Sequence, residues 1–335
     1  MADTMLRQVL AELPSAVARE YSRRGELQRL RVVGHAPRDD HFMYEISAEF
    51  IQGQERLTAK IYRPKCAGGA KRVAARENAN LQYVHQFHKK LDGVPRPIGD
   101  FSEWGAVVME KVAGFSFQSI IMKAALVPAV SDNGNVSAMA QRAGEWLRKF
   151  HKATLDLPEP CDGSALIAGL KQLCEKCRRE GLDESSIGVI REGAENAIGQ
   201  VDGSLSTSAV LNEFTPLNVV VTERSTAFGN FAAMKRRGNS LEDVALFLAS
   251  VEALEKYPFC NHSVTRQIQQ HFLDAYKVSE AEAAILRVMK IKSLLEMFVQ
   301  GDGKESGARK RTMWANAMKR FIHKAAHRSL SAAAA

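Results

Sequence analysis

The chain has 335 residues, of which 45% are hydrophobic and 25% are charged. These fractions are typical of a soluble globular protein, and the length allows a large buried core. No run of 18 apolar residues occurs, so we expect no membrane-spanning helix. The first seven residues lack the basic region and apolar core of a signal peptide, which favours a cytoplasmic protein.

The formal net charge is +8, which predicts attraction to anions without identifying one. We expect no nucleic-acid partner, because no known binding module and no aromatic platform with interleaved basic residues is present. The five cysteines include one C-x-x-C pair, Cys174 and Cys177, in a segment that predicts a helix. Without a second pair or a histidine pair, the sequence argues against a zinc site and against a disulfide framework.

The first part of the chain predicts a helix followed by a sheet. Residues 1–30 carry apolar side chains at helical spacing, and residues 31–112 indicate strands around one helix. The predicted apolar face of the first helix consists of Leu6, Val9, Leu10, Leu13 and Val17.

Residues 57–62 alternate like a strand and carry one lysine, Lys60. Seventeen residues later, Glu77 begins a stretch in which Leu81, Val84 and Phe87 recur at helical spacing. Two interpretations of the lysine are open. Lys60 either faces inward as the partner of Glu77, or it is a solvent-facing lysine on an edge strand.

Residues 211–221 combine a polar loop with an apolar run. Glu213 and Asn218 are five positions apart, Thr215 and Pro216 lie between them, and three valines follow. Phosphoryl transfer from ATP needs a loop carboxylate to receive the hydroxyl proton of the acceptor, and an amide oxygen to hold a metal ion. The pattern is therefore typical of a phosphotransferase catalytic loop that leads into a buried strand.

This loop resembles the "H-G-D-x-x-P-x-N" loop of the aminoglycoside phosphotransferase and choline kinase families. Other segments resemble the same families in the same order along the chain, and the resemblance covers about residues 30 to 300. They are the strand around Lys60, the helix around Glu77, the hinge segment 105–114, the helix end 146–151, the "I-D-F/W"-like segment 228–231 and the "G-D-P-L-x-D-L-A"-like segment 238–245.

The resemblance implies a protein-kinase-like α+β fold with a small β-rich lobe and a large, mainly helical lobe. The implied boundaries are an N-terminal helical segment at 1–30, a small lobe at 31–112, a large lobe at 113–308, and a C-terminal helix and tail at 309–335. ATP and Mg²⁺ are the implied cofactors, and the acceptor is an unidentified small molecule.

The resemblance also implies a role for each matching residue. Lys60 contacts the ATP phosphates and Glu77 pairs with it, while Glu213 is the catalytic carboxylate. The adenine lies against the hinge, and two amides stand at the metal positions. The implied hinge residues are Met109, Glu110 and Val112, and the implied metal ligands are Asn218 and Asn230.

Four positions depart from the family pattern. Leu211 replaces the histidine that braces the loop, and Asn212 replaces a glycine, although asparagine tolerates a left-handed backbone better than most residues. Glu213 replaces the catalytic aspartate and adds one methylene, and a displacement of about 1 Å can cost about 100-fold in rate. Asn230 replaces the metal-binding aspartate, whereas Mg²⁺ prefers carboxylates. The resemblance therefore implies that both the proton acceptor, at Glu213, and the metal ligand, at Asn230, are weakened.

Residues 309–328 predict a basic helix, with Trp314, Met318, Phe321 and Ala325 at helical spacing. Such a helix either packs its apolar face on the large lobe, which we favour, or contacts a membrane surface or a protein partner.

Three hypotheses for function follow. The first is a degenerate kinase-like protein that binds a nucleotide and transfers phosphate poorly or not at all, and it is the one we favour. The second is an active phosphotransferase for a sugar, a lipid-linked glycan or a small hydroxyl metabolite. The third is an interaction protein that is recruited to a membrane surface by residues 309–328. We do not expect an aminoglycoside acceptor, because acidic and basic residues are mixed between Cys161 and Gly203.

Overall fold

The computed structural model describes residues 2–126, 133–160, 162–199, 204–222, 225–257, 259–301 and 308–330. The chain divides into two compact units. Unit 1 contains Met1–Gly114 and Thr222–Met234, and unit 2 contains Phe115–Val221 and Lys235–Ala335.

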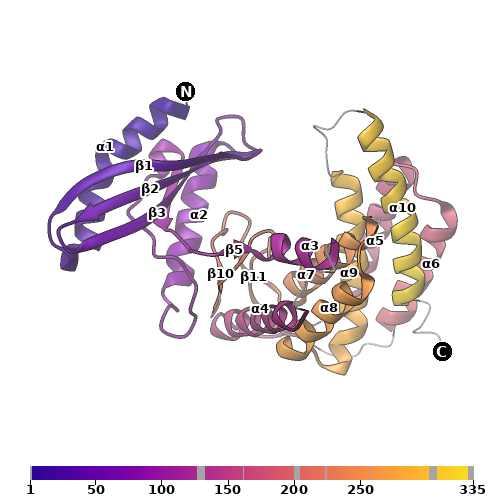
Figure 1. Cartoon of the computed structure of the whole chain (residues 1–335). Coiled ribbons are helices and arrows are strands. Elements are labelled where there is room, and N and C mark those ends of the chain that lie inside the picture. Colours follow the sequence, from indigo (N-terminus) through magenta and orange to yellow (C-terminus); the bar gives the residue numbers. More distant parts are fainter. Residues whose placement is uncertain are drawn as a thin grey trace. The chain divides into compact units, whose positions relative to one another are not determined.

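Unit 1 is built on a four-stranded antiparallel sheet with the order β1-β2-β3-β4. Its elements are α1 (Ala2–Glu20), η1 (Ser22–Arg24), β1 (Leu27–Pro37), β2 (His41–Phe50), β3 (Gly53–Tyr62), α2 (Ala70–His85), η2 (Ser102–Trp104), β4 (Ala106–Glu110) and β10 (Thr226–Phe228). Figure 1 shows α1 lying along the sheet strands.

The period of two along the strands gives this sheet two different faces. Alternate residues of β2, β3 and β4 form a buried apolar face, to which Ile46, Leu57 and Ala59 belong. Helix α1 covers this face with the predicted side chains, among them Val9 and Leu13. The opposite face carries Lys60, so α1 and the lysine lie on different sides of the sheet.

Unit 2 is mainly helical. Its helices are α3 (Phe117–Leu126), α4 (Asn133–Ala153), α5 (Gly163–Arg179), α6 (Glu184–Gly199), α7 (Leu241–Glu252), η4 (Ala253–Lys256), α8 (His262–Tyr276), α9 (Glu280–Gln300) and α10 (Ala308–Leu330). Its short strands pair antiparallel: β5 (Phe115–Ser116) with β9 (Val219–Val221), β6 (Glu159–Pro160) with β7 (Ser204–Leu205), and β8 (Thr207–Val210) with β11 (Lys235–Asn239). The expected α+β class, with a sheet in the first part and helices in the second, is confirmed.

Several boundaries differ from the sequence-based expectation. Strand β1 begins at Leu27, inside the segment predicted as helical, and α2 begins at Ala70, before the predicted start. Residues 262–300 form two helices, α8 and α9, separated by a short turn. Lys277 ends α8 with a φ of 67°, and Ser279 caps α9 with a complete capping box to Glu282.

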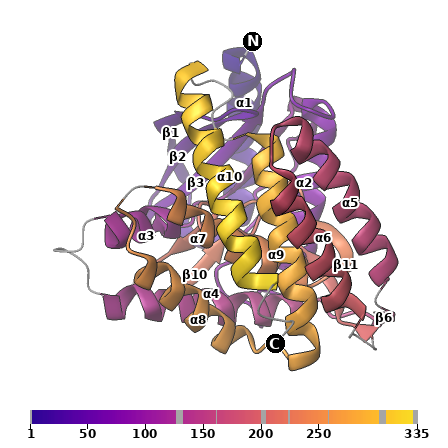
Figure 2. The same cartoon turned by 90° about the vertical axis from the view of Figure 1, so that its right-hand side faces the viewer.

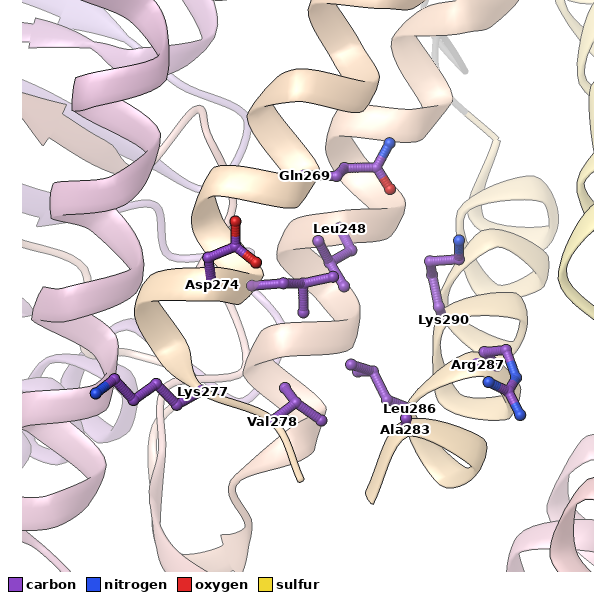
Figure 3. Close-up of a pocket in the computed structure, with 10 residues that line it drawn as sticks. Leu248, Gln269, Asp274, Lys277, Val278, Ala283, Leu286, Arg287 and Lys290 are labelled. Carbon is purple, nitrogen blue, oxygen red and sulfur yellow. The ribbon is translucent and has the colours of Figure 1, made fainter. Parts of the chain in front are cut away.

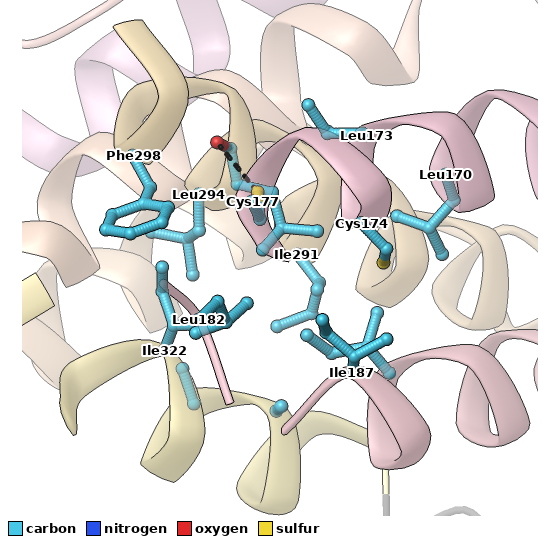
Figure 4. Close-up of a cluster of buried hydrophobic side chains, with 14 of the residues drawn as sticks. Leu170, Leu173, Cys174, Cys177, Leu182, Ile187, Ile291, Leu294, Phe298 and Ile322 are labelled. Carbon is cyan, nitrogen blue, oxygen red and sulfur yellow. Dashed lines mark hydrogen bonds between the residues drawn. The ribbon is translucent and has the colours of Figure 1, made fainter. Parts of the chain in front are cut away.

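A large apolar cluster joins α5, α6, α9 and α10 (Figures 2 and 4). Cys174 and Cys177 lie inside it, and burial raises the pKa of Cys174 to about 11 and that of Cys177 to about 12. Both thiols therefore stay protonated near neutral pH, and Cys177 donates a weak hydrogen bond to the Leu295 carbonyl over 3.8 Å. The expectation that this pair is structural agrees with its place in the core.

The same cluster contains the apolar face of α10, including Met318, Phe321 and Ile322. The described part of this face is thus occupied within unit 2, which agrees with the packing interpretation and gives no support to contact with a membrane surface; the side chain of Trp314 lies outside the described part. Arg328 also anchors the helix through Glu252 and Glu255, at 3.2 and 3.3 Å. In the described ranges, no helix is long and apolar enough to cross a membrane.

Candidate functional site: a buried lysine cluster and a kinase-like loop

Lys60 lies on β3 and is only 5% exposed. Its ammonium nitrogen is 2.6 Å from Glu77 Oε1, 2.9 Å from the Gly229 carbonyl and 3.1 Å from Asn230 Oδ1. An ammonium has three donor hydrogens, so these three acceptors match its capacity. The solvent-facing interpretation of Lys60 is therefore wrong, and the inward one is correct.

Glu77 is fully buried on α2 and is held by three donors. Besides Lys60, these are the Tyr62 hydroxyl, 2.6 Å from Oε2, and the Phe231 backbone N–H, 3.1 Å from Oε1. A buried carboxylate is tolerated when it is paired and hydrogen-bonded in this way. The Glu77 carboxylate thus connects β3, α2 and the segment after β10.

Asn80 holds the other end of the segment that follows β10. Its side-chain amide donates to the carbonyls of Phe231 and Met234, both at 3.0 Å. Residues 229–234 are therefore held against α2 by Glu77 and Asn80 together, which keeps the Asn230 side chain beside Lys60. A long-range contact of this kind has no periodic signal in the sequence.

The predicted hinge residues lie at the end of β4. Met109 is buried, and a Cβ atom on Gly229 would lie 3.9 Å from its sulfur. Met109 pairs with Thr58 and Val107 pairs with Lys60, so Met109 shares the sheet face of Lys60. Glu110 ends the strand and Val112 follows it half-buried.

In unit 2, the loop after β8 is held by one carboxylate. Asp243, in the first turn of α7, accepts the backbone N–H groups of Leu211 at 2.7 Å and Asn212 at 2.8 Å. Asn212 has a φ of 59°, the left-handed conformation that asparagine tolerates better than most residues. An asparagine at this position therefore suits the backbone of the loop.

Asp243 also contacts His151, which in turn contacts Tyr276. His151 Nε2 lies 3.1 Å from Asp243 Oδ2, and His151 Nδ1 lies 2.9 Å from the Tyr276 hydroxyl. Because a carboxylate only accepts, we assign the ring proton to Nε2 and let Nδ1 accept from Tyr276. Burial raises the pKa of Tyr276, so its hydroxyl keeps the proton that it donates. Leu211, where the resemblance implies a histidine, is fully buried.

Further along the loop, Asn218 faces back to Glu213. The Asn218 amide nitrogen donates to the Glu213 carbonyl at 3.0 Å, and the Thr215 N–H donates to the same carbonyl at 2.8 Å. This leaves Asn218 Oδ1 as the acceptor of that side chain. The Glu213 side chain is half-buried, and its backbone is fixed by the turn around Thr215.

These residues suit a phosphate better than a metal ion. Lys60 is a cation that could meet a phosphate in exchange for one of its three present acceptors. The two predicted metal ligands, Asn218 and Asn230, offer neutral amide oxygens. Mg²⁺ favours carboxylates, and Asn230 Oδ1 already accepts from Lys60. In the described part of the chain, no three His, Cys, Asp or Glu side chains gather to hold a metal. The residues therefore fit Mg²⁺ poorly.

The structure brings the predicted residues together as two groups, one in each unit. Lys60, Glu77, Met109 and Asn230 form the group in unit 1, which we call the lysine cluster. Glu213 and Asn218 belong to the loop in unit 2. Sequence reasoning missed Tyr62, which strand alternation from Lys60 could have revealed, and Tyr276, for which the sequence holds no signal.

The fold of the chain is similar to that of kinase-like phosphotransferases of known structure. Among similar solved structures, glucosamine kinase is 12% identical, with a TM-score of 0.55, and the match covers 89% of this chain and 94% of the other. A thermostable mutant of aminoglycoside phosphotransferase APH(4)-Ia, in complex with AMP-PNP and hygromycin B, is 12% identical, with a TM-score of 0.55 and coverage of 94% and 98%. Amicoumacin kinase hAmiN, in complex with AMP-PNP, Ca²⁺ and Ami, is 12% identical, with a TM-score of 0.52 and coverage of 92% and 93%.

These likenesses confirm the expected fold. No protein-family model matches the sequence, and no curated protein matches it.

Proposed function

We propose that this protein binds a nucleotide through the lysine cluster and that its capacity for phosphoryl transfer is weakened or lost. The fold supports this proposal, since the similar structures of APH(4)-Ia and amicoumacin kinase contain AMP-PNP. ATP is therefore the first nucleotide to test.

The observation that carries the proposal is the charge balance around Lys60. The ammonium and the Glu77 carboxylate cancel, and the third side chain at the ammonium is the neutral amide of Asn230. An aspartate at that position would add one negative charge, which a divalent cation could neutralise. With asparagine, the cluster offers a cation to phosphate and little to Mg²⁺.

Calorimetric titration of ATP, once with EDTA and once with excess Mg²⁺, tests this proposal. We expect binding in both conditions, with similar affinity. In Asn230→Asp we expect binding that depends strongly on Mg²⁺, because the new carboxylate repels free ATP and attracts the metal. Absence of ATP binding in both conditions would sink the proposal.

A second candidate function is an active small-molecule phosphotransferase. Its support is the loop in unit 2, where the Asp243 carboxylate holds the backbone and Asn218 is fixed against the Glu213 carbonyl. In this case the Glu213 carboxylate would accept the hydroxyl proton of a sugar or another small alcohol.

ADP release with a panel of sugars and hydroxyl metabolites separates the two candidates. The active enzyme would show acceptor-dependent ADP release that falls at least 100-fold in Glu213→Gln, whereas the control Glu296→Gln on α9 would keep the rate. Our preferred proposal predicts no acceptor-dependent release above background in the unmodified chain.

A further inference from the structure

His41 begins β2 on the same face of the sheet as Lys60. His41 pairs with Tyr62 of β3, and Met43 pairs with Lys60, so His41 and Lys60 are diagonal neighbours across the two strands. Diagonal neighbours of an antiparallel pair are about 7–8 Å apart, within reach of long and aromatic side chains. A ligand at the Lys60 ammonium therefore lies within reach of an imidazole.

Backbone hydrogen bonds hold the turn between β1 and β2 in place. The Arg38 N–H donates to the His41 carbonyl at 2.8 Å, and the Arg63 N–H donates to the Asp40 carbonyl at 2.8 Å. The Arg63 guanidinium donates to the Arg38 carbonyl at 2.9 and 3.1 Å. His41 thus follows a turn that the residue after β3 braces.

Two neighbours orient the His41 ring. Nδ1 lies 2.6 Å from Asp40 Oδ1, and the ring centroid lies 5.6 Å from that of Tyr62, whose hydroxyl holds Glu77. Because a carboxylate only accepts, we assign the proton of the neutral ring to Nδ1, which leaves a lone pair on Nε2. Within the described residues Nε2 has no hydrogen bond, and the side chain is 15% exposed.

The surroundings keep this imidazole neutral in the free protein. Burial lowers the pKa of His41 below its ordinary value and repulsion by the Lys60 ammonium lowers it further, while the Asp40 hydrogen bond and the charges of Asp40 and Glu77 act the other way. The charged or titratable groups at the turn and beside it are Lys60 and Tyr62 on β3, Glu77 on α2, Arg38, Asp39 and Asp40 in the turn, and Arg63 and Cys66 after β3. Burial, and then Asp40, raises the pKa of the Cys66 thiol, which therefore stays protonated near neutral pH.

We infer that His41 is a second phosphate contact beside Lys60 and that it takes up one proton from the solvent when ATP binds. The inference rests on the proposed nucleotide function and deepens it. A phosphate oxygen and the Nε2 lone pair are both acceptors, so they form a hydrogen bond only when a new N–H bond forms at Nε2. The imidazolium then donates to Asp40 from Nδ1 and to the phosphate from Nε2, and the phosphate charge stabilises it. The proton supplies positive charge at a site whose Asn230 attracts Mg²⁺ poorly.

Calorimetric titration of ATP with EDTA, in two buffers of different ionisation enthalpy, counts the protons that are taken up. Because phosphate groups also titrate at about pH 6, the quantity of interest is the difference between the unmodified chain and His41→Gln. At about pH 7 we expect the unmodified chain to take up about 0.3 to 1 proton more than His41→Gln. From about pH 6.5 to about pH 8, its ATP affinity should fall about 3- to 10-fold more than that of the variant, because the imidazolium contact is lost as pH rises.

Two variants and one spectroscopic readout accompany this titration. His88→Gln removes an exposed histidine of the same unit and should keep the proton uptake, whereas Asp40→Asn removes the partner of the imidazolium and should reduce it. In the unmodified chain, the nitrogen chemical shifts of His41 should change from the neutral Nδ1–H form to the imidazolium when ATP is added. This readout needs no variant, so it stands even if His41→Gln does not fold.

ATP bound elsewhere would not give the same signal. In unit 2, a groove of about 510 Å³ between α7, α8 and α9 presents the cations Lys277 and Lys290 (Figure 3). The described residues that line this groove include no histidine, so ATP there would meet no side chain that ordinarily titrates near pH 7. Lys277→Gln should therefore leave both ATP affinity and proton uptake unchanged.

The outcomes separate this inference from the nucleotide proposal. ATP binding with equal proton uptake in the unmodified chain and His41→Gln, or His41 shifts that stay those of the neutral ring when ATP is bound, would overturn the inference and leave nucleotide binding in place. No ATP binding across the pH range would refute the nucleotide proposal itself, and the inference with it.

Discussion

Lys60 and Glu77 depend on each other for their burial. The carboxylate is fully buried and the ammonium is 5% exposed, so neither charge is solvated when its partner is removed. Breaking a buried ion pair by removing one partner costs about 3–5 kcal/mol, while removing both charges can be nearly neutral. The same two residues therefore carry a structural role and the proposed ligand contact.

Lys60→Met should lower the free energy of unfolding by about 3–5 kcal/mol, because Glu77 is left buried without its cation. The double variant Lys60→Met with Glu77→Gln should regain most of that loss, since the amide oxygen can accept from the Phe231 N–H and the amide NH2 can donate to the Tyr62 hydroxyl oxygen. Urea unfolding of the three proteins measures this. Equal stability of the single and double variants would show that the two charges are not coupled.

Tyr276 supports the loop in unit 2 indirectly, because it holds His151, which contacts Asp243. Tyr276→Phe leaves His151 Nδ1 without its donor in a buried site, and it should cost about 1–3 kcal/mol in unfolding free energy. The control Tyr257→Phe, at a position 38% exposed, should stay within about 0.5 kcal/mol.

The nitrogen chemical shifts of His151 give a second readout for Tyr276→Phe. The assignment made above predicts the Nε2–H form of the ring in the unmodified chain and a change at Nδ1 in the variant. Shifts of the Nδ1–H form in the unmodified chain would contradict it.

At the scale of elements, α10 is a packing helix. Its apolar residues complete the cluster of α5, α6 and α9, and Arg328 ties it to η4 through Glu255. The amphipathic pattern in the sequence left open whether that face packs on the large lobe or contacts a membrane surface or a protein partner. The packing within unit 2 favours the first alternative. A pattern of apolar residues identifies a face to be covered and leaves open what covers it.

Ile322→Ala in α10 should lower the unfolding free energy by about 2–5 kcal/mol, because the side chain is fully buried. Lys324→Ala, at an exposed position of the same helix, should change it by no more than about 0.5 kcal/mol. Chemical unfolding measures both. A helix that served a membrane surface would show the opposite, with unchanged stability in Ile322→Ala and weaker vesicle binding.

At the scale of the whole molecule, local patterns predicted much of the fold. The strand with Lys60, the helix with Glu77 and the left-handed Asn212 follow from alternation, helical spacing and residue chemistry. What those patterns could not predict are contacts between distant segments. Residues 222–234 belong to unit 1, and Phe231 reaches Glu77 across 154 positions.

The same distinction, between local residue types and contacts of distant segments, applies to the candidate site. Sequence alone indicated which residue types depart from the family pattern, a longer carboxylate at Glu213 and a neutral amide at Asn230, because a residue type is visible without coordinates. It could not indicate that Asn230 accepts from Lys60, beside the Lys60–Glu77 pair whose charges cancel, so that the lysine cluster is neutral. That neutrality leads to the central claim, that nucleotide binds here without help from a metal.

The most direct test is thermal melting with ATP, with and without Mg²⁺, for the unmodified chain and for the double variant Lys60→Met with Glu77→Gln. Ligand at about 100 times its dissociation constant adds about 2.7 kcal/mol, a shift of a few degrees. We predict a shift in the unmodified chain that is the same with and without Mg²⁺ and is absent from the double variant. A shift that appears only with Mg²⁺, or one that the double variant keeps, would contradict the account.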